Sequence, residues 1–254
     1  MTAVSKLRSW QLGDFVGVDG CRRGWFAVWI TETGVWSHRI FESVDLLFGQ
    51  LGDASHILID MQIGLVDEGT QGRRCEAEGR KLLGPARRSS IFVSPSRLSL
   101  AASTYGEASR INREKTGRKL SKQTWWIMPK IREVDELMES RPEARERLFE
   151  VNIELLFWAL NESHAMKHYK KTAQGFSERM ELLNHWFPQS TDLYEDALSS
   201  YLRKHVSRDD IVDAIAAAIS SFATRGELQE IPSERQIDLK GLPMRMVIPR
   251  LPGA

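Results

Sequence analysis

The sequence predicts an α/β protein whose mixed β-sheet is flanked by helices, and three observations support this fold class. Three apolar, β-favouring segments near the N-terminus follow one another at hairpin spacing, which is typical of an antiparallel meander. A helix and a further strand come next, and such a step adds a parallel strand to the sheet. An alanine-rich helical pattern near residue 210 supplies a long helix to cover it.

Five strands are expected, each rich in apolar and β-branched residues. The first, DFVGVD at residues 14–19, ends at the turn-like pair Asp19-Gly20. The short Glu32-Thr33 connection joins the second strand to the third. The remaining strands are predicted at residues 24–31, 34–41, 56–61 and 148–153.

Helices are predicted between and after these strands. Ser43 can cap the helix VDLLFGQL, and the segment from residue 61 to 140 is expected to be mainly helical, with a turn at Pro129. After the fifth strand the helical pattern continues to Leu202 and is expected to break at Gly175 and Pro188. The last helix, at residues 208–222, has acidic residues in its first turn, where the helix dipole favours them.

Composition and length indicate one compact domain. The 254 residues are 42% hydrophobic and 27% charged, which excludes wholesale disorder and fibrous repeats. No apolar stretch approaches the roughly 18 residues that span a bilayer, and the N-terminus lacks a signal-peptide pattern, so a cytoplasmic protein without a membrane partner is expected. The two cysteines, Cys21 and Cys75, cannot form a disulfide framework and are expected to be reduced, buried thiols.

Charge is unevenly distributed, although the net charge is only +1. Residues 71–97 contain seven basic and two acidic side chains, a net +5, and residues 110–133 contain eight and two, a net +6. A basic middle of this kind can present one positive face to phosphates. Solvated helix faces are the alternative explanation.

Acidic residues occur where predicted strands end. Asp19 closes the first strand, Asp60 lies near the end of the fourth, and Glu154 follows the fifth. Asp210 and Asp213 are three residues apart and share one face of the last helix. A carboxylate on an apolar strand is costly unless it is hydrogen-bonded, paired or bound to a cation, and all-oxygen clusters suit Mg²⁺ or Mn²⁺. Each acid alone is equally consistent with a turn or a helix start.

Several motifs together resemble one known family. VGVDGCRRGW at residues 16–25, the LID at Leu58–Asp60, RRCEAEGRKLLG, IFVSPSR, GRKLSKQTWWIMPKIREVDELM, FEVNIELLFWALNE, KKTAQGFSERMELL and DDIVDAIAAA resemble the family called domain of unknown function 429. The resemblance covers nearly the whole chain. It implies a ribonuclease H-like fold and nuclease activity, with a five-stranded mixed sheet flanked by helices and a helical insertion after strand four, at about residues 66–145 of a single domain spanning residues 1–254.

The resemblance also assigns site residues. Asp19, Asp60 and Asp213 fall on the acidic positions of that fold, with Asp210 or Glu154 as a fourth ligand. The sequence departs from the family pattern at two places, where relatives read LIDIPIGL and EVHPE. Here the corresponding residues are Met61-Gln62 and Asn152-Ile153, which can shift the geometry or adapt the site to another substrate.

Cations in the matching segments are candidate phosphate ligands, because arginine forks hold phosphate oxygens bidentately. They are Arg73, Arg74, Arg97, Lys122 and Lys130. Trp125 and Trp126 can stack an unpaired base, although packing in the core is the expected role of at least one of them. His164 and His168 have helical spacing but no third ligand, which favours a surface helix over a zinc site.

The leading hypothesis is a Mg²⁺- or Mn²⁺-dependent nuclease that hydrolyses phosphodiester bonds by a two-metal type of mechanism. Two alternatives stay open: a nucleic-acid-binding protein of the same fold without catalysis, and an actin-like nucleotide phosphotransferase, suggested by GVDGCRRG. The absence of GxSxG, GxxxxGK[ST] and GxGxxG patterns argues against serine hydrolases, P-loop NTPases and dinucleotide enzymes. Homo-oligomer formation is compatible with the sequence, which does not specify it.

Overall fold

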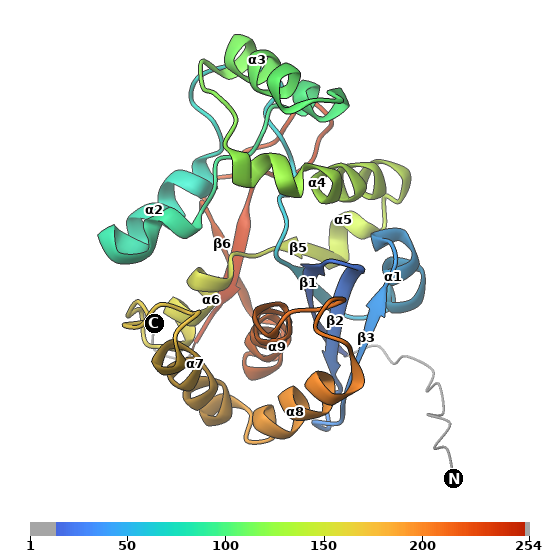
Figure 1. The fold of residues 1–254 in the computed structure, drawn as a ribbon, viewed down its shortest axis with the longest axis vertical. Coiled ribbons are helices and arrows are strands. Elements are labelled where there is room, and N and C mark those ends of the chain that lie inside the picture. The colour runs from blue at the N-terminus through green and yellow to red at the C-terminus, as the bar shows by residue number, and fades with distance from the viewer. Residues whose placement is uncertain (1–13, 252–254) are drawn as a thin grey trace.

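The computed structural model describes residues 14–251, and their centre is a five-stranded mixed sheet (Figure 1). Its strands are β1 (Phe15–Cys21), β2 (Gly24–Ile30), β3 (Trp36–Phe41), β4 (His56–Ile59) and β5 (Leu148–Glu150). They lie in the order β3-β2-β1-β4-β5; β1, β2 and β3 form an antiparallel meander, whereas β4 and β5 run parallel to β1. The α/β class is thus confirmed, and the strand order is the one expected of a ribonuclease H-like sheet.

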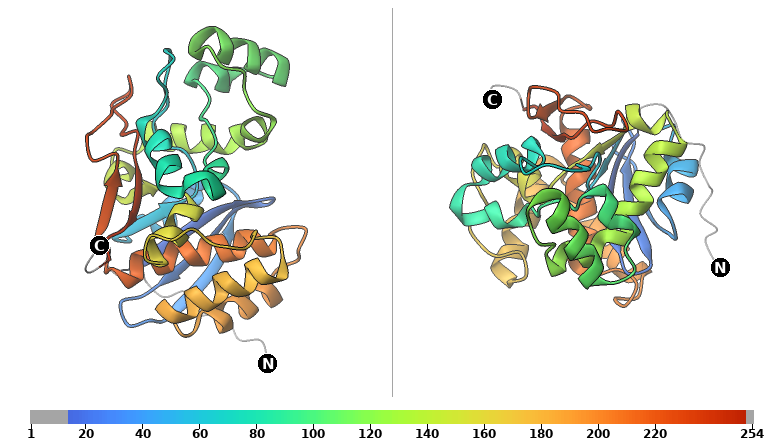
Figure 2. Two further views of the ribbon diagram at one scale, coloured as in Figure 1. Left: turned by 90° about the vertical axis from the view of Figure 1, so that its left-hand side faces the viewer. Right: turned by 90° about the horizontal axis from the view of Figure 1, so that it is seen from above.

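Helices cover both faces of the sheet, because alternate side chains of each strand enter two different cores. Trp25, Ala27 and Trp29 of β2 pack on one face, whereas Phe26 and Val28 pack on the other. The first face is covered by α1 (Val44–Leu51), α4 (Lys122–Ser140) and α5 (Ala144–Arg147). The second is covered by α6 (Ile153–Leu160), α7 (Ala173–Trp186), α8 (Ser190–Ser200) and α9 (Arg208–Ala223), and Figure 2 shows the two layers.

Close packing between α9 and β1 fixes the position of the last helix. A Cβ atom at Gly17 would lie 2.2 Å from both the carbonyl oxygen of Ala214 and the backbone nitrogen of Ala218. Only glycine at this point of β1, facing alanines on α9, allows the two backbones to approach so closely. The contact places the first turns of α9 beside the carboxyl end of β1.

Four helices lie between β4 and β5, where the sequence predicts a helical insertion. They are α2 (Arg74–Arg87), α3 (Tyr105–Thr116), α4 and α5, with 3-10 turns at Arg88–Ser90 and Arg97–Ala101. The predicted turn at Pro129 is wrong, because α4 continues through this exposed residue. Met128 and Ile131 pack into the sheet core on either side of it, and their burial outweighs the hydrogen bond that proline removes.

Some element boundaries also differ from the prediction. The fifth strand ends at Glu150 instead of residue 153, because the Asn152 side chain accepts a hydrogen bond from Leu155 N and caps α6. Gly175 does not break a helix but lies in the first turn of α7. The segment between α6 and α7, which holds His164 and His168, is not helical.

A second, two-stranded sheet near the C-terminus was not predicted. β6 (Leu228–Ile231) pairs antiparallel with β7 (Met246–Pro249). Ile231, Met246 and Ile248 form a separate small core with Cys75 of α2 and Leu155 of α6. Within residues 14–251, none of the helices has both the length and the apolar character needed to cross a bilayer.

Candidate functional site

Three aspartates meet at one end of the main sheet. β1 and β4 are parallel neighbours, so their carboxyl ends share an edge, and Asp60 N donates to Val18 O at 3.0 Å. Gly17 and Leu58 face the α9 side of the sheet. Asp19 and Asp60 lie two residues further along each chain segment, so their carboxylates are on the same side. Asp213, which is 4% exposed, precedes Ala214 on that helix. We call Asp19, Asp60 and Asp213 the carboxylate cluster.

Burial is the largest cause that disfavours ionisation of all three acids, and neighbouring carboxylates add to it. Burial is the larger cause for Asp60, and the nearby charge of Asp213 adds to it, so the pKa of Asp60 rises to about 7. The pKa of Asp19 is well above its usual value for the same reasons, with Asp213 and Asp60 as neighbours. Burial also raises the pKa of Asp213, although Lys170 opposes the shift. The cluster therefore carries negative charge that the fold compensates incompletely.

Lys170 is the cation that meets this cluster. Its Nζ atom lies 2.8 Å from Asp213 Oδ2 and donates a hydrogen bond to it. Burial alone would lower the pKa of the Lys170 ammonium, but the charges of Asp213, Asp19 and Asp60 raise it above its usual value. Lys170 therefore stays protonated and holds Asp213.

The loop that carries Lys170 is firmly anchored to α7. The Glu178 carboxylate accepts hydrogen bonds from Lys167 N at 2.7 Å and His168 N at 2.9 Å, and Arg179 donates to His168 O at 3.2 Å. A Cβ atom at Gly175 would lie 2.0 Å from Tyr169 O, so the loop backbone packs directly on the helix. The ammonium position is consequently built into the fold.

An open cleft of about 210 Å³ reaches two members of the cluster, Asp19 and Asp60. It is lined by residues from β1, β4, β5, β7, α4 and the segment after α2: Asp19, Gly20, Asp60, Met61, Gln62, Ser90, Ile91, Phe92, Trp126, Ile127, Lys130, Glu150, Val151, Asn152 and Met246. Gln62 Oε1 and Ser90 Oγ are buried there, and the described residues offer them no hydrogen-bond partner. Gln62 and Asn152, two of the residues that depart from the family pattern, both line this cleft.

The carboxylate cluster suits a divalent cation by the type of its donors, because Mg²⁺ and Mn²⁺ prefer carboxylate oxygens. Nevertheless, within residues 14–251 no three acidic, histidine or cysteine side chains are grouped so as to hold an ion. Asp213 is directed to Lys170 instead. The donors thus fit such an ion chemically, and the Lys170 ammonium competes with it for Asp213.

Comparison with known proteins identifies a family for this chain. A family described as "Protein of unknown function (DUF429)" has a model that matches residues 17–237. The chain belongs to the DUF429 family. No curated protein and no solved structure matches the chain. The matched span contains Lys170 and the whole carboxylate cluster.

The other predicted acids of this DUF429 chain have different partners. Asp210 forms a capping box with Ser207, accepting from Ser207 N at 2.8 Å, although its charge still contributes to the raised pKa of Asp19. Glu154 lies on α6 and accepts from Arg179 Nη2 at 2.5 Å. Glu150, which was not predicted, is the acid of β5 that lines the cleft. The strand-end criterion selected Glu154 because the fifth strand was predicted to reach residue 153, whereas it ends at Glu150.

The two predicted arginines Arg73 and Arg97 are buried and neutralise buried acids. Arg73 holds Glu150 through two hydrogen bonds, one of them 3.0 Å between Nη1 and Oε1. Arg97 donates to Asp135 at 3.1 Å and also to Asp238. Neither guanidinium is directed toward solvent, so neither is in a position to bind a substrate phosphate.

The remaining predicted cations are closer to the surface. Arg74 is exposed and pairs with Glu234 at 2.8 Å, and Lys122 Nζ lies 3.5 Å from the centre of the Tyr105 ring. Lys130 lines the cleft, where its ammonium donates to Gly24 O and lies 4.4 Å from the centre of a Trp25 ring. Lys130 is therefore the predicted cation nearest to the carboxylate cluster.

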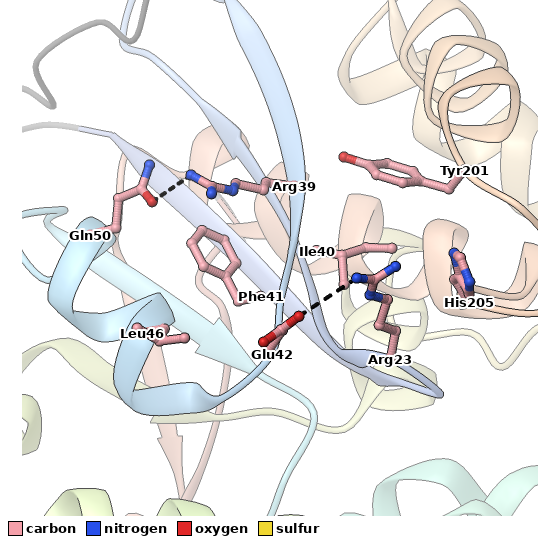
Figure 3. Close-up of a pocket in the computed structure, with 9 residues that line it drawn as sticks. All are labelled: Arg23, Arg39, Ile40, Phe41, Glu42, Leu46, Gln50, Tyr201 and His205. Carbon is pink, nitrogen blue, oxygen red and sulfur yellow. Dashed lines mark hydrogen bonds and ion pairs between the residues drawn. The ribbon is translucent and has the colours of Figure 1, made fainter.

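A larger hollow of about 510 Å³ lies on the outer edge of the sheet, beside β3 and α1. Figure 3 shows that its cations already have partners: Arg39 donates to Gln50, and Arg23 pairs with Glu42. No member of the carboxylate cluster lines it. By size alone this hollow would be the better candidate for the functional site. The chemistry of the lining side chains instead favours the smaller cleft as that site.

Proposed function

We propose that this DUF429 protein is a metal-dependent hydrolase of phosphodiester bonds in nucleic acid. The observation that carries the proposal is the carboxylate cluster, in which three buried acids, from the ends of β1 and β4 and from α9, have raised pKa values, and two of them, Asp19 and Asp60, line an open cleft. Strongly perturbed acids beside a cleft are characteristic of functional sites. Carboxylates without enough compensating donors are also natural ligands for a divalent cation.

The residues have separate tasks in this proposal. Asp19, Asp60 and Asp213 would hold Mg²⁺ or Mn²⁺, which when bound activates water and stabilises the leaving oxygen of a phosphodiester. Lys170 orients Asp213 through its 2.8 Å hydrogen bond and adds positive charge toward an anionic substrate. Glu150 is held by Arg73 and by Ile63 N at 2.7 Å, so its carboxylate forms a rigid wall of the cleft.

Calorimetric titration with Mn²⁺ tests the metal site directly. Wild-type protein should bind Mn²⁺, and Asp60→Asn should lose that binding because the amide is a weaker ligand. Asp196→Asn is the matched control, since Asp196 pairs with His38 at 3.0 Å outside the cleft. Equal Mn²⁺ binding by wild type and Asp60→Asn would refute the carboxylate site.

Cleavage is measured separately on single-stranded, duplex and branched DNA and RNA with Mn²⁺ present. Wild type should release shorter products from at least one of these substrates, and Asp19→Asn should release none while its unfolding transition stays cooperative. If wild type binds Mn²⁺ but cuts none of them, the hydrolase proposal fails.

A nucleic-acid-binding protein without catalysis is the second candidate. The ion pair between Lys170 and Asp213 favours it, because that pair satisfies part of the cluster without a metal. This alternative predicts nucleic-acid binding that weakens with salt and no products in the presence of Mn²⁺. The cleavage assay and a binding assay on the same substrates separate the two functions.

A further inference from the structure

A groove lined by cations adjoins the cleft. It measures about 490 Å³ and shares Ile91 and Phe92 with the cleft as lining residues. Its cations are Arg80, Arg88, Arg118 and Lys119. They come from both basic segments of the sequence, which the fold brings to one surface. We call this surface the basic groove.

Three cations of the basic groove are available to a ligand. Arg88, Arg118 and Lys119 are exposed, and within residues 14–251 none of them pairs with a carboxylate. The guanidinium of Arg80 is instead used internally, donating to Ile91 O at 3.0 Å. Unpaired cations along a groove beside an acidic site attract a polyanion, whose backbone phosphates they can neutralise.

An exposed tryptophan lies in the lining of the cleft. Trp126 on α4 lines the cleft and is 76% exposed. Trp125 packs instead against Tyr105, with ring centres 6.2 Å apart. A large aromatic face left in water is a recognised platform for stacking an unpaired base, and Phe92, which lines both the cleft and the groove, supplies a second aromatic side chain.

Polar atoms in the lining of the same cleft suit the edge of a base. Gln62 Oε1 can accept a hydrogen bond and Ser90 Oγ can donate or accept one, and both atoms are buried without a partner among the described residues. Buried polar atoms of this kind cost free energy until a ligand or water satisfies them. Flat aromatic surface together with hydrogen-bonding groups is the combination that recognises unstacked bases.

We propose that the basic groove and the cleft together bind one single strand of nucleic acid. Its backbone lies along Arg88, Arg118 and Lys119, one unstacked base rests on Trp126, and an adjacent phosphodiester reaches the carboxylate cluster. A duplex is disfavoured because its bases already stack on each other and present no free face. The position of the cleaved bond rests on the proposed function, whereas the binding of the strand does not.

Fluorescence anisotropy with a labelled single strand and the matching duplex, both in EDTA, measures binding without cleavage. Wild type should prefer the single strand. Trp126→Ala should weaken single-strand binding by about 5- to 150-fold, the range expected for one lost stacking contact, and Trp126→Phe should restore most of it. Leu239→Ala is the control, because Leu239 is 85% exposed and lies outside both pockets.

The same assay at several salt concentrations tests the groove. Arg88→Gln and Lys119→Gln should each reduce the salt dependence by the equivalent of about 0.7 counterions, whereas Arg203→Gln, at an exposed arginine outside both pockets, should leave it unchanged. The inference is overturned if Trp126→Ala binds as wild type or if duplex binds as tightly as single strand. Binding without cleavage in Mn²⁺ would support this inference and refute the hydrolase, so the two failures are distinguishable.

Discussion

Two groups of acidic side chains in this protein differ in how their charges are satisfied. In the Arg97 cluster, formed by Arg97, Asp67, Asp135, Asp238 and Lys240, Asp238 accepts from three backbone N–H groups as well as from Arg97, and Asp135 accepts from both cations. In the carboxylate cluster, Asp213 accepts from Lys170, but within residues 14–251 Asp19 accepts only from Gly20 N at 2.7 Å and no residue donates to the Asp60 carboxylate.

The two groups also differ in whether the fold favours their charged state. Burial alone would lower the pKa of Arg97, but its hydrogen bonds to Asp135 and Asp238 raise it, so this ion network favours its own charged state. In the carboxylate cluster burial and repulsion prevail, and the pKa values of the acids rise. Buried acids with a full set of donors tie loops together, whereas buried acids that lack donors keep an energetic cost that a bound cation would reduce.

The largest effect is expected from breaking the Arg97 cluster. Arg97→Met should lower the free energy of unfolding by about 3–5 kcal/mol, because Asp135 and Asp238 would stay buried without their guanidinium partner. Urea denaturation measures the change. Arg74→Met, which removes an exposed pair, is the control and should cost less than about 1 kcal/mol. Similar losses for both variants would show that the Arg97 cluster is not structural.

A substitution in the carboxylate cluster should change the free energy of unfolding in the opposite direction. Asp60→Asn should raise the free energy of unfolding at pH 8 by about 1–3 kcal/mol, because the amide removes a buried charge that the fold disfavours. The same urea titration detects it. A destabilised Asp60→Asn would mean that the charge of Asp60 is compensated in the native state, contrary to the contrast above.

The fold and the three aspartates follow from local rules, which is why the sequence indicates them. Alternating apolar residues predict the strands of the main sheet, and Ser43 and Ser207 cap their helices by accepting backbone hydrogen bonds. Asp19 and Asp60 were candidates because a carboxylate at the end of an apolar strand is costly. β6 and β7 were not predicted because half of β6 is polar (Gln229 and Glu230), β7 ends in Pro249, and a long irregular segment separates the two strands.

The partners of the charged residues could not be predicted, because they depend on contacts far apart in the chain. Arg73 and Arg97 look like exposed cations in a basic segment, yet they meet Glu150 and Asp238, which lie 77 and 141 residues away in sequence. Lys170 has no distinguishing local pattern, and only the anchoring of its loop to α7 brings it to Asp213. The local sequence therefore predicts which acids carry an unfavourable buried charge, but not which cations pair with them.

The raised pKa of Asp60 in the carboxylate cluster should make the wild-type protein less stable, relative to Asp60→Asn, as the pH rises. The unfolded pKa of Asp60 is near 3.8 and the folded pKa is about 7, so the destabilisation is complete above pH 7 and disappears below pH 3.8. The stability difference between Asp60→Asn and wild type should therefore shrink steadily as pH falls from 8 toward 4. Chemical denaturation of both proteins at a series of pH values measures it, and a constant difference would contradict the raised pKa.

The smallest effect is expected from Lys170, whose side chain is one-third exposed. Lys170→Met should tighten Mn²⁺ binding by about 5-fold, the equivalent of about 1 kcal/mol, because the cation no longer competes for Asp213. Lys171→Met is the matched control: its neighbouring side chain is exposed, and the substitution should leave Mn²⁺ affinity unchanged. Loss of Mn²⁺ binding in Lys170→Met would instead show that Lys170 is needed to hold Asp213 in place for the metal. Calorimetry on the two variants thus decides between two roles for Lys170. Tighter Mn²⁺ binding in Lys170→Met means that the ammonium occupies the place of the metal, whereas lost binding means that the ammonium orients Asp213 for it.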